Sequence, residues 1–119
     1  LRYTHTFRPA GLVRGPNESL ALYDQKGYTV AEVKNTWTDP NNPYNGINVK
    51  LISPTNQKLE VQFHTPESYE LKNGPMHQLY EQWRALPEDS DEALELQNRM
   101  FALARNLKTP QNISEVRKK

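Results

Sequence analysis

Five polar residues share one face of a predicted β-hairpin near the middle of the chain. In residues 44–65, YNGINVKLISPTNQKLEVQFHT, apolar and polar side chains alternate on either side of a short polar connection. A period of two is typical of a hairpin that buries one face. One acid among several hydrogen-bond donors suits a ligand that is anionic and bears hydroxyl groups. The polar face carries Asn48, Lys50, Glu60, Gln62 and His64.

Glu60 lies between two apolar neighbours on this polar face. A lone strand glutamate is usually a solvated carboxylate, because charged residues are mostly exposed. The functional alternative is a metal ligand or a general base near a nucleotide. Mg²⁺ often combines one or two carboxylates with substrate phosphates, so we expect Mg²⁺ as the cofactor, with Glu60 as its ligand. The histidines show neither HxxxH nor HExxH spacing, which argues against zinc.

Four further residues extend the candidate site. Tyr44, two residues before Gly46, could pack on the edge of the sheet or stack on a base. His77 opens a predicted helix, where it either faces water or bonds a phosphate. Lys34 and Arg2 are suited by charge to contact phosphates, although a strand lysine is usually a surface residue.

The remaining patterns predict an α+β fold. Strands are expected at residues 1–8 and 28–37, with a helix at 18–26 between them, capped by Asn17 and ended by Gly27. Helices are expected at residues 67–73, 75–86 and 91–107, the last capped by Ser90. We therefore predict a mixed sheet of about four strands, with a β-α-β unit and a hairpin, followed by two or three helices packed on the sheet.

Composition narrows the function classes. The 119 residues fit one domain, which we place at residues 1–107, followed by a flexible tail at 108–119 with little to bury. The net charge of +1 argues against bulk nucleic-acid binding. No apolar run is long enough to span a membrane, and no signal peptide is recognisable. Because the chain begins at Leu1, in a strand-like segment, we expect it to belong to a longer protein.

These motifs resemble the synthetase domain of the RelA/SpoT family, the alarmone (p)ppGpp synthetases. That family has a tyrosine, a small or polar pair, an aliphatic residue and a histidine, followed by a strand with the pattern E-hydrophobic-Q-hydrophobic-R-T. The corresponding segments are YNGIN at residues 44–48 and EVQFHT at residues 60–65. KNTW at residues 34–37 resembles the family's Lys-Asp-Tyr strand end, and His77 with Tyr80 resembles its later histidine and tyrosine. Arg2 resembles the arginine of an earlier strand, whose aspartate would precede Leu1.

The resemblance implies a pyrophosphate transfer from ATP to the 3′-hydroxyl of a guanine or adenine nucleotide. It implies that Tyr44 stacks on the base of the acceptor nucleotide. Glu60 would activate the 3′-hydroxyl or hold Mg²⁺. Gln62, Lys34 and His77 would position the acceptor and the phosphates, in a reaction that depends mostly on positioning and charge neutralisation.

Three residues depart from the family pattern. Asn35 replaces an aspartate, Asn48 a histidine and His64 an arginine, and the last change removes a guanidinium fork suited to phosphate. Asn48, His64 and Arg2 remain candidate substrate contacts. The family's basic ATP-side motif and metal aspartate are not in this sequence. We therefore expect the 119 residues alone to bind ATP poorly and to show little synthesis.

The segment QFHTPES at residues 62–68 resembles RelA/SpoT-like domains at the C-termini of large bacterial or phage proteins, toxins among them. Expected partners are then ATP, a purine nucleotide, other segments of a larger protein, and an immunity or antitoxin protein. The expected site of action is the cytoplasm, after delivery in a secreted or phage-borne protein. Two alternatives stay open: a degenerate module that binds a nucleotide or RNA, and a structural or interaction domain.

Overall fold

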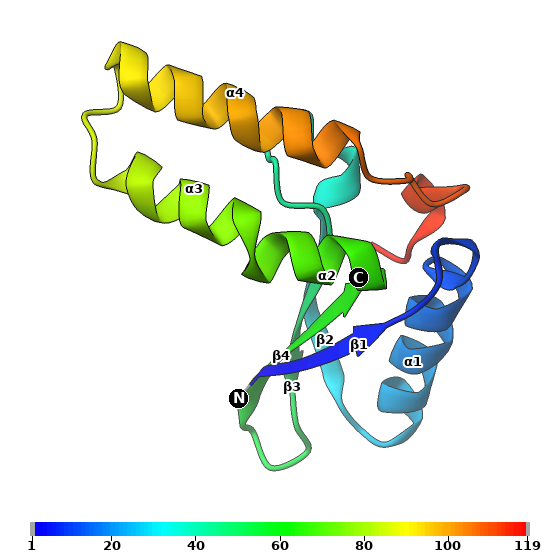
Figure 1. The fold of residues 1–119 in the computed structure, drawn as a ribbon. Coiled ribbons are helices and arrows are strands. Elements are labelled where there is room, and N and C mark those ends of the chain that lie inside the picture. The colour runs from blue at the N-terminus through cyan, green and yellow to red at the C-terminus, as the bar shows by residue number, and fades with distance from the viewer. Residues whose placement is uncertain (1, 119) are drawn as a thin grey trace.

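A mixed four-stranded β-sheet lies at the centre of the structure, a computed structural model that describes residues 2–118 (Figure 1). β1 runs parallel to β4, and the β4–β3 and β3–β2 pairs are antiparallel. This sheet confirms the predicted α+β class. Leu1, expected in the first strand, and Lys119, expected in the tail, lie outside the described residues. The strands, in the sheet order β1-β4-β3-β2, are β1 (Arg2–Thr6), β4 (Lys58–His64), β3 (Ile47–Ile52) and β2 (Thr29–Asn35).

Helix α1 (Arg14–Gln25) connects β1 to β2 in the predicted β-α-β unit. The pairings make β1 and β2 run in the same direction at opposite edges of the sheet, so the chain crosses one whole face between them. Leu20 of α1 is fully buried there against the apolar side of the sheet. The hairpin residues predicted to face the core are also buried, with at most 1% exposure: Ile47, Val49, Leu51, Val61 and Phe63.

Helix α1 begins earlier than the sequence predicts. The expected start was residue 18 with Asn17 as the cap, because Pro16 looked like part of a loop. Pro16 instead lies buried in the first turn of the helix, where a missing backbone N–H has no intrahelical partner to lose. Asn17 holds the C-terminal segment: its Oδ1 accepts a 2.8 Å hydrogen bond from the backbone N–H of Arg117. Gly27 follows the helix with φ +84°, the left-handed conformation expected there.

Strand β2 ends at Asn35, before the predicted end at residue 37. The Asn35 Oδ1 accepts a 3.1 Å hydrogen bond from the Trp37 N–H and caps a 3₁₀ turn at Thr36–Thr38. This turn directs the chain away from the sheet into the loop of residues 39–46. The β3–β4 hairpin itself matches the prediction, with its turn at residues 53–57 and Asn56 at φ 66°.

Three helices follow the sheet: α2 (Pro66–Asn73), α3 (Pro75–Arg84) and α4 (Asp91–Arg105). Their starts agree with the predicted ones to within a residue, and Gly74 separates α2 from α3 as expected. α2 continues directly from β4, whereas α3 and α4 pack chiefly against one another and project beyond the end of the sheet (Figure 1). None of the helices in residues 2–118 is both long and apolar enough to cross a membrane.

The C-terminal segment packs against the core. Ile113 and Val116 are only 8% and 4% exposed and belong to the main hydrophobic cluster. The Asn35 side chain donates a 2.7 Å hydrogen bond to the Ile113 carbonyl, which joins this segment to the end of β2. The expectation that residues 108–119 form a tail with little to bury is therefore wrong. Two apolar residues, one in a short 3₁₀ turn and one just after it, gave too weak a periodic pattern to reveal this contact.

Candidate functional site

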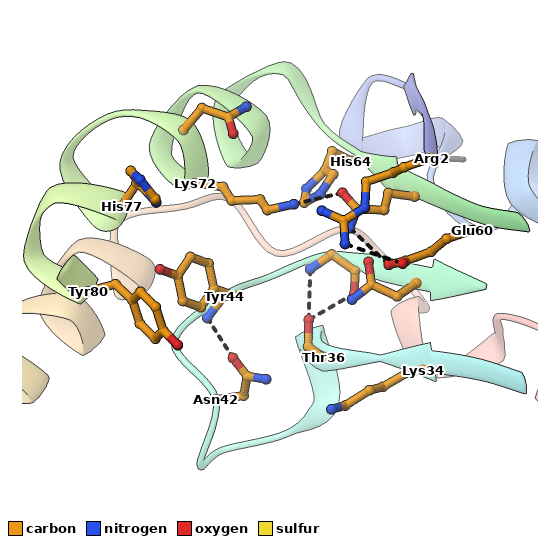
Figure 2. Close-up of a pocket in the computed structure, with 14 residues that line it drawn as sticks. Arg2, Lys34, Thr36, Asn42, Tyr44, Glu60, His64, Lys72, His77 and Tyr80 are labelled. Carbon is orange, nitrogen blue, oxygen red and sulfur yellow. Dashed lines mark hydrogen bonds and ion pairs between the residues drawn. The ribbon is translucent and has the colours of Figure 1, made fainter. Parts of the chain in front are cut away.

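A cavity of about 550 Å³ opens on the polar face of the sheet, the face opposite α1. Helices α2 and α3 and the loop of residues 39–46 form its other walls (Figure 2). Residues from all four strands, the loop and both helices therefore meet there. Among them are all those predicted as site residues: Arg2, Lys34, Tyr44, Asn48, Glu60, Gln62, His64 and His77.

The register of the sheet brings the predicted polar residues together. Arg2 on β1 lies beside Glu60 on β4, and Gln62 lies beside Asn48 on β3. Asn48 in turn lies beside Lys34 on β2. Because residues in register on one face of a sheet are neighbours, side chains scattered over the sequence form two adjacent rows across the cavity floor.

A chain of hydrogen bonds runs across this floor. Arg2 Nη2 donates to Glu60 Oε2 over 3.2 Å, and Gln62 Nε2 donates to Glu60 Oε1 over 3.3 Å. Lys72 on α2 donates to Gln62 Oε1 over 2.7 Å. Because Lys72 offers only donors, it fixes the orientation of the Gln62 amide, whose NH₂ group then points at Glu60 (Figure 2).

Glu60 is held in its charged form. Partial burial raises the pKa of Glu60, but hydrogen bonds from Gln62 and Arg2 and the charges of Arg2 and Lys72 outweigh it and leave the pKa lowered. A general base is most effective when its pKa lies near the working pH. Glu60 is thus better suited to accept a hydrogen bond from a ligand hydroxyl than to remove its proton unaided.

Lys72 is the main cavity residue that the sequence reasoning missed. Its ammonium group is partly buried, which lowers the pKa of Lys72, as does the nearby charge of Arg2, while Glu60 raises it. Lys72 lies ten residues from Gln62 in the sequence. A separation of ten residues predicts no contact by itself. Lys72 reaches Gln62 because α2 starts directly after β4 and turns back over the cavity.

His64 belongs to the cavity wall but is itself only 3% exposed. Its Nδ1 lies 3.0 Å from Ser68 Oγ, and its ring packs against Gly46, where an added Cβ would be 2.5 Å from His64 Cε1. Burial, assisted by the charge of Lys72, lowers the pKa of His64 to about 4, although the nearby Asn45 backbone opposes this shift. His64 is therefore neutral at pH 7 and supplies no positive charge to the cavity.

The loop that carries Tyr44 is fixed to the end of β2. Thr36 Oγ1 donates to the Gly46 carbonyl and accepts from the Gly46 N–H, both over 2.9 Å, and Thr36 is buried. Within the loop, the Tyr44 N–H donates to Asn42 Oδ1 over 2.9 Å. These bonds hold Tyr44 and Asn42 at the cavity.

Aromatic side chains form one end of the cavity. The rings of Tyr44 and Tyr80 meet edge to face with centroids 5.9 Å apart, and Tyr80 in turn packs near Trp83. Burial, with the nearby Tyr80 and Glu81, raises the pKa of Tyr44 to about 12, so its hydroxyl stays protonated. Figure 2 shows this aromatic end on the opposite side of the cavity from Arg2 and Glu60, with Lys72 reaching across between them.

His77 and Lys34 are more exposed than the cavity floor. His77, on α3, lies at the aromatic end with its Nε2 3.7 Å from Glu81 Oε1, and its side chain is 58% exposed. Lys34 is exposed on the edge strand β2. Lys50, which shares the predicted polar face and lies opposite Glu60, instead pairs with Glu32 over 3.1 Å.

The cavity offers little support for a metal ion bound by protein alone. Glu60 is the one carboxylate among the described residues that line the cavity. Arg2 and Gln62 already hydrogen-bond to its two oxygens. Within residues 2–118 no three His, Asp or Glu side chains cluster closely enough to hold a metal. These residues do not fit a Mg²⁺ site by themselves, and the expected ion would need phosphate oxygens of a bound nucleotide as further ligands.

Comparison with known proteins identifies a similar fold. No protein-family model matches the sequence, and no curated protein matches it significantly. Among solved structures, a chain in the crystal structure of the complex between the Type VI effector Tas1 and its immunity protein is similar, with a TM-score of 0.58 and 22% identity. The match covers 87% of this chain but only 65% of that one, and at this identity it shows likeness of fold alone.

Proposed function

We propose that the cavity is the acceptor site of a nucleotide pyrophosphokinase-like transferase, which moves a pyrophosphate from ATP to the 3′-hydroxyl of a purine nucleotide. The observation that carries the proposal is the meeting of all eight predicted residues in one cavity, although they come from separate strands, a loop and a helix. The RelA/SpoT-like motifs place an acceptor base at Tyr44 and a hydroxyl at Glu60. In the structure these residues lie at opposite ends of the same cavity.

The charge of the cavity also supports a phosphorylated ligand. Arg2, Lys34 and Lys72 contribute positive charge, and Glu60 alone contributes negative charge. A partly enclosed site with excess positive charge attracts anions and strengthens their hydrogen bonds. Tyr44, at the other end, provides an aromatic surface for a base.

In the proposed reaction, the 3′-hydroxyl oxygen of the acceptor forms a bond to the β-phosphorus of ATP. The bond from that phosphorus to the oxygen shared with the α-phosphorus breaks, and AMP leaves with that oxygen. The hydroxyl proton passes to water or to a carboxylate. Glu60 would orient the hydroxyl by accepting its hydrogen bond, and Arg2 would neutralise charge on the incoming phosphates, so that positioning supplies most of the rate.

A second candidate is a module that binds a nucleotide or an RNA end without catalysis. The observation that favours it is the engagement of both Glu60 oxygens, which leaves the carboxylate a weak base. The two candidates differ in the effect of Glu60→Gln. In a longer parent protein, a transferase loses its activity in this variant while it stays folded. A binding module has no such activity to lose, and the variant retains most of its nucleotide affinity.

The solved structure with a similar fold suggests what kind of protein could bind this chain. It comes from a complex between a Type VI effector and its immunity protein. We propose by analogy that this chain acts within a larger toxin-like protein on cytoplasmic nucleotides, and that an immunity or antitoxin protein binds it.

The test is calorimetric titration of GDP, GTP, AMP and ATP, each with and without Mg²⁺, into the 119-residue chain. Tyr44→Ala is the test variant. Tyr3→Ala is the control, because Tyr3 is 48% exposed and lies in register with the core residue Val61, on the other face of the sheet. We expect micromolar binding of one purine nucleotide and weak binding of ATP. Loss of stacking in Tyr44→Ala should weaken binding by roughly tenfold or more.

Binding that is unaffected by Tyr44→Ala would exclude the proposed position of the base. A folded chain that binds none of the four nucleotides would contradict the acceptor site altogether. The Tyr3→Ala control should match the wild type in either case.

A further inference from the structure

Two cations approach the Glu60 carboxylate from its two sides. Arg2 hydrogen-bonds directly to Oε2 over 3.2 Å. Lys72 reaches the Oε1 side through the Gln62 amide, over successive distances of 2.7 and 3.3 Å. The single negative charge of Glu60 thus lies between two positive charges, one from the edge strand β1 and one from helix α2.

This arrangement favours a further anion. Arg2 and Lys72 are close enough for the charge of Arg2 to disfavour protonation of Lys72, and Lys72 also loses hydration through partial burial. One carboxylate cannot balance both cations. An anion placed beside Glu60 would relieve the repulsion and replace the lost hydration of the ammonium group.

Lys72 has donors left for such an anion. An ammonium group carries three N–H donors, of which the bond to Gln62 Oε1 uses one. Lys72 lines the cavity, so a ligand can reach the remaining donors without displacing Gln62. A phosphate, with several oxygens on one centre, could bond to Lys72 and to the Arg2 guanidinium together.

We propose that Lys72 is a phosphate-binding residue that acts with Arg2 to hold a phosphoryl group beside the Glu60 carboxylate. Within the proposed function, on which the identity of the ligand rests, this is the position of a phosphate carried by the 3′-oxygen of the acceptor. The ligand class at this end of the cavity is therefore a nucleotide with a 3′-phosphate or 3′-diphosphate, and its minimal form is inorganic pyrophosphate.

The experiment titrates five ligands into the folded chain. They are inorganic pyrophosphate and two purine pairs, adenosine with 3′-AMP and guanosine with 3′-GMP. Lys72→Met removes the charge and keeps much of the side-chain length, and Lys72→Arg restores the charge. Lys58→Met is the matched control, because Lys58 is an exposed lysine at the far end of β4, outside the cavity. Thermal unfolding checks that each variant is folded.

We expect Lys72→Met to weaken pyrophosphate and the 3′-monophosphate by roughly tenfold or more, the effect of one hydrogen bond to a charged group. Nucleoside affinity should change little, Lys72→Arg should recover part of the loss, and Lys58→Met should behave as the wild type. The salt dependence of pyrophosphate binding should also become shallower in Lys72→Met, because one screened charge is gone.

Other results would overturn the inference. An equal loss for nucleoside and 3′-monophosphate would show that Lys72 only orients Gln62. Unchanged pyrophosphate affinity in folded Lys72→Met, or no pyrophosphate binding by the wild type, would remove Lys72 from phosphate recognition. Pyrophosphate binding that depends on Lys72, with no nucleoside or nucleotide preference, would leave the phosphate site standing and contradict the proposed acceptor site instead.

Discussion

Glu60 and His64 share one face of strand β4, but their surroundings favour the charged form of Glu60 and the neutral form of His64. Glu60 is partly solvated and hydrogen-bonded by Arg2 and Gln62, so its charged form is favoured. His64 is enclosed by Gly46, Ser68 and α2, so its charged form is disfavoured. The cavity therefore draws its charge from Arg2, Lys34, Lys72 and Glu60, while His64 forms part of the wall.

The lowered pKa of His64 predicts a pH-dependent stability. In the unfolded chain His64 binds a proton near pH 6.5, whereas in the folded chain it does so only near pH 4. The unfolded state therefore binds more protons between these values, and stability falls as the pH drops through this window. We expect His64 to account for a loss of about 2 kcal/mol in the free energy of unfolding between pH 7 and pH 5.

Urea denaturation of the wild type and of His64→Gln at these two pH values measures this effect. The variant should be less stable at pH 7 but should show a much flatter pH dependence. Glu60 and Asp24 should contribute equally to the pH dependence of stability in the wild type and in the variant. Their pKa values are lowered, so they affect stability chiefly at still lower pH. An equal slope in wild type and variant would contradict the assignment to His64.

Helix α2 connects strand β4 of the sheet to a wall of the cavity. Thr65 directly follows β4 and caps α2. Its side chain accepts a 3.1 Å hydrogen bond from the Ser68 N–H, and Ser68 Oγ accepts a 3.0 Å bond from the Thr65 N–H. This reciprocal cap fixes the angle at which α2 leaves the strand. The position of Lys72 over Gln62 depends on that angle.

The side-chain N-caps of α2 and α4, Thr65 and Ser90, provide a matched pair of variants. Ser90 caps α4, where its Oγ accepts from the Ala93 N–H over 3.2 Å, and α4 makes no part of the cavity. We expect Thr65→Ala and Ser90→Ala each to lower the free energy of unfolding by about 1 kcal/mol. Only Thr65→Ala should also weaken pyrophosphate binding, measured by calorimetry. Equal binding by both variants would show that the cap does not position Lys72.

For the molecule as a whole, the apolar face of the sheet is closed by two segments from opposite ends of the chain. Helix α1 supplies Leu20, and the C-terminal segment supplies Ile113 and Val116. Asn17 and Asn35 fasten the C-terminal segment by hydrogen bonds to its backbone. These two segments bury the apolar residues of β2, β3 and β4, so the other face of the sheet is left to form a polar cavity.

Ile113→Ala tests the contribution of the C-terminal segment. We expect the free energy of unfolding to fall by about 2–4 kcal/mol, because a buried side chain is replaced by a cavity in the core. Leu94→Ala is the control, since Leu94 is 50% exposed on α4, and it should change stability by less than about 0.5 kcal/mol. Chemical denaturation measures both. A loss for Ile113→Ala no larger than that for Leu94→Ala would mean that the segment adds nothing to the core.

Local sequence patterns determined the elements and the two faces of the hairpin. Strand side chains alternate between faces, so Glu60 and Gln62 had to share one side while Val61 and Phe63 shared the other. Proline, glycine and the Ser90 cap likewise marked the starts of α2, α3 and α4, because such residues act within a few positions of their own. The ends of α3 and α4 lie two residues before the predicted ones, at Arg84 and Arg105.

Tertiary structure alone decided which residues meet in the cavity and in what charge state. Lys72 reaches Gln62 across a strand-to-helix turn, Lys50 turns to Glu32 rather than to Glu60, and Ile113 returns to the core. Each contact joins separate elements, so no local period encodes it. Charge states depend on desolvation and on neighbours in space, which is why the sequence could name His64 but could not show that it is buried and neutral.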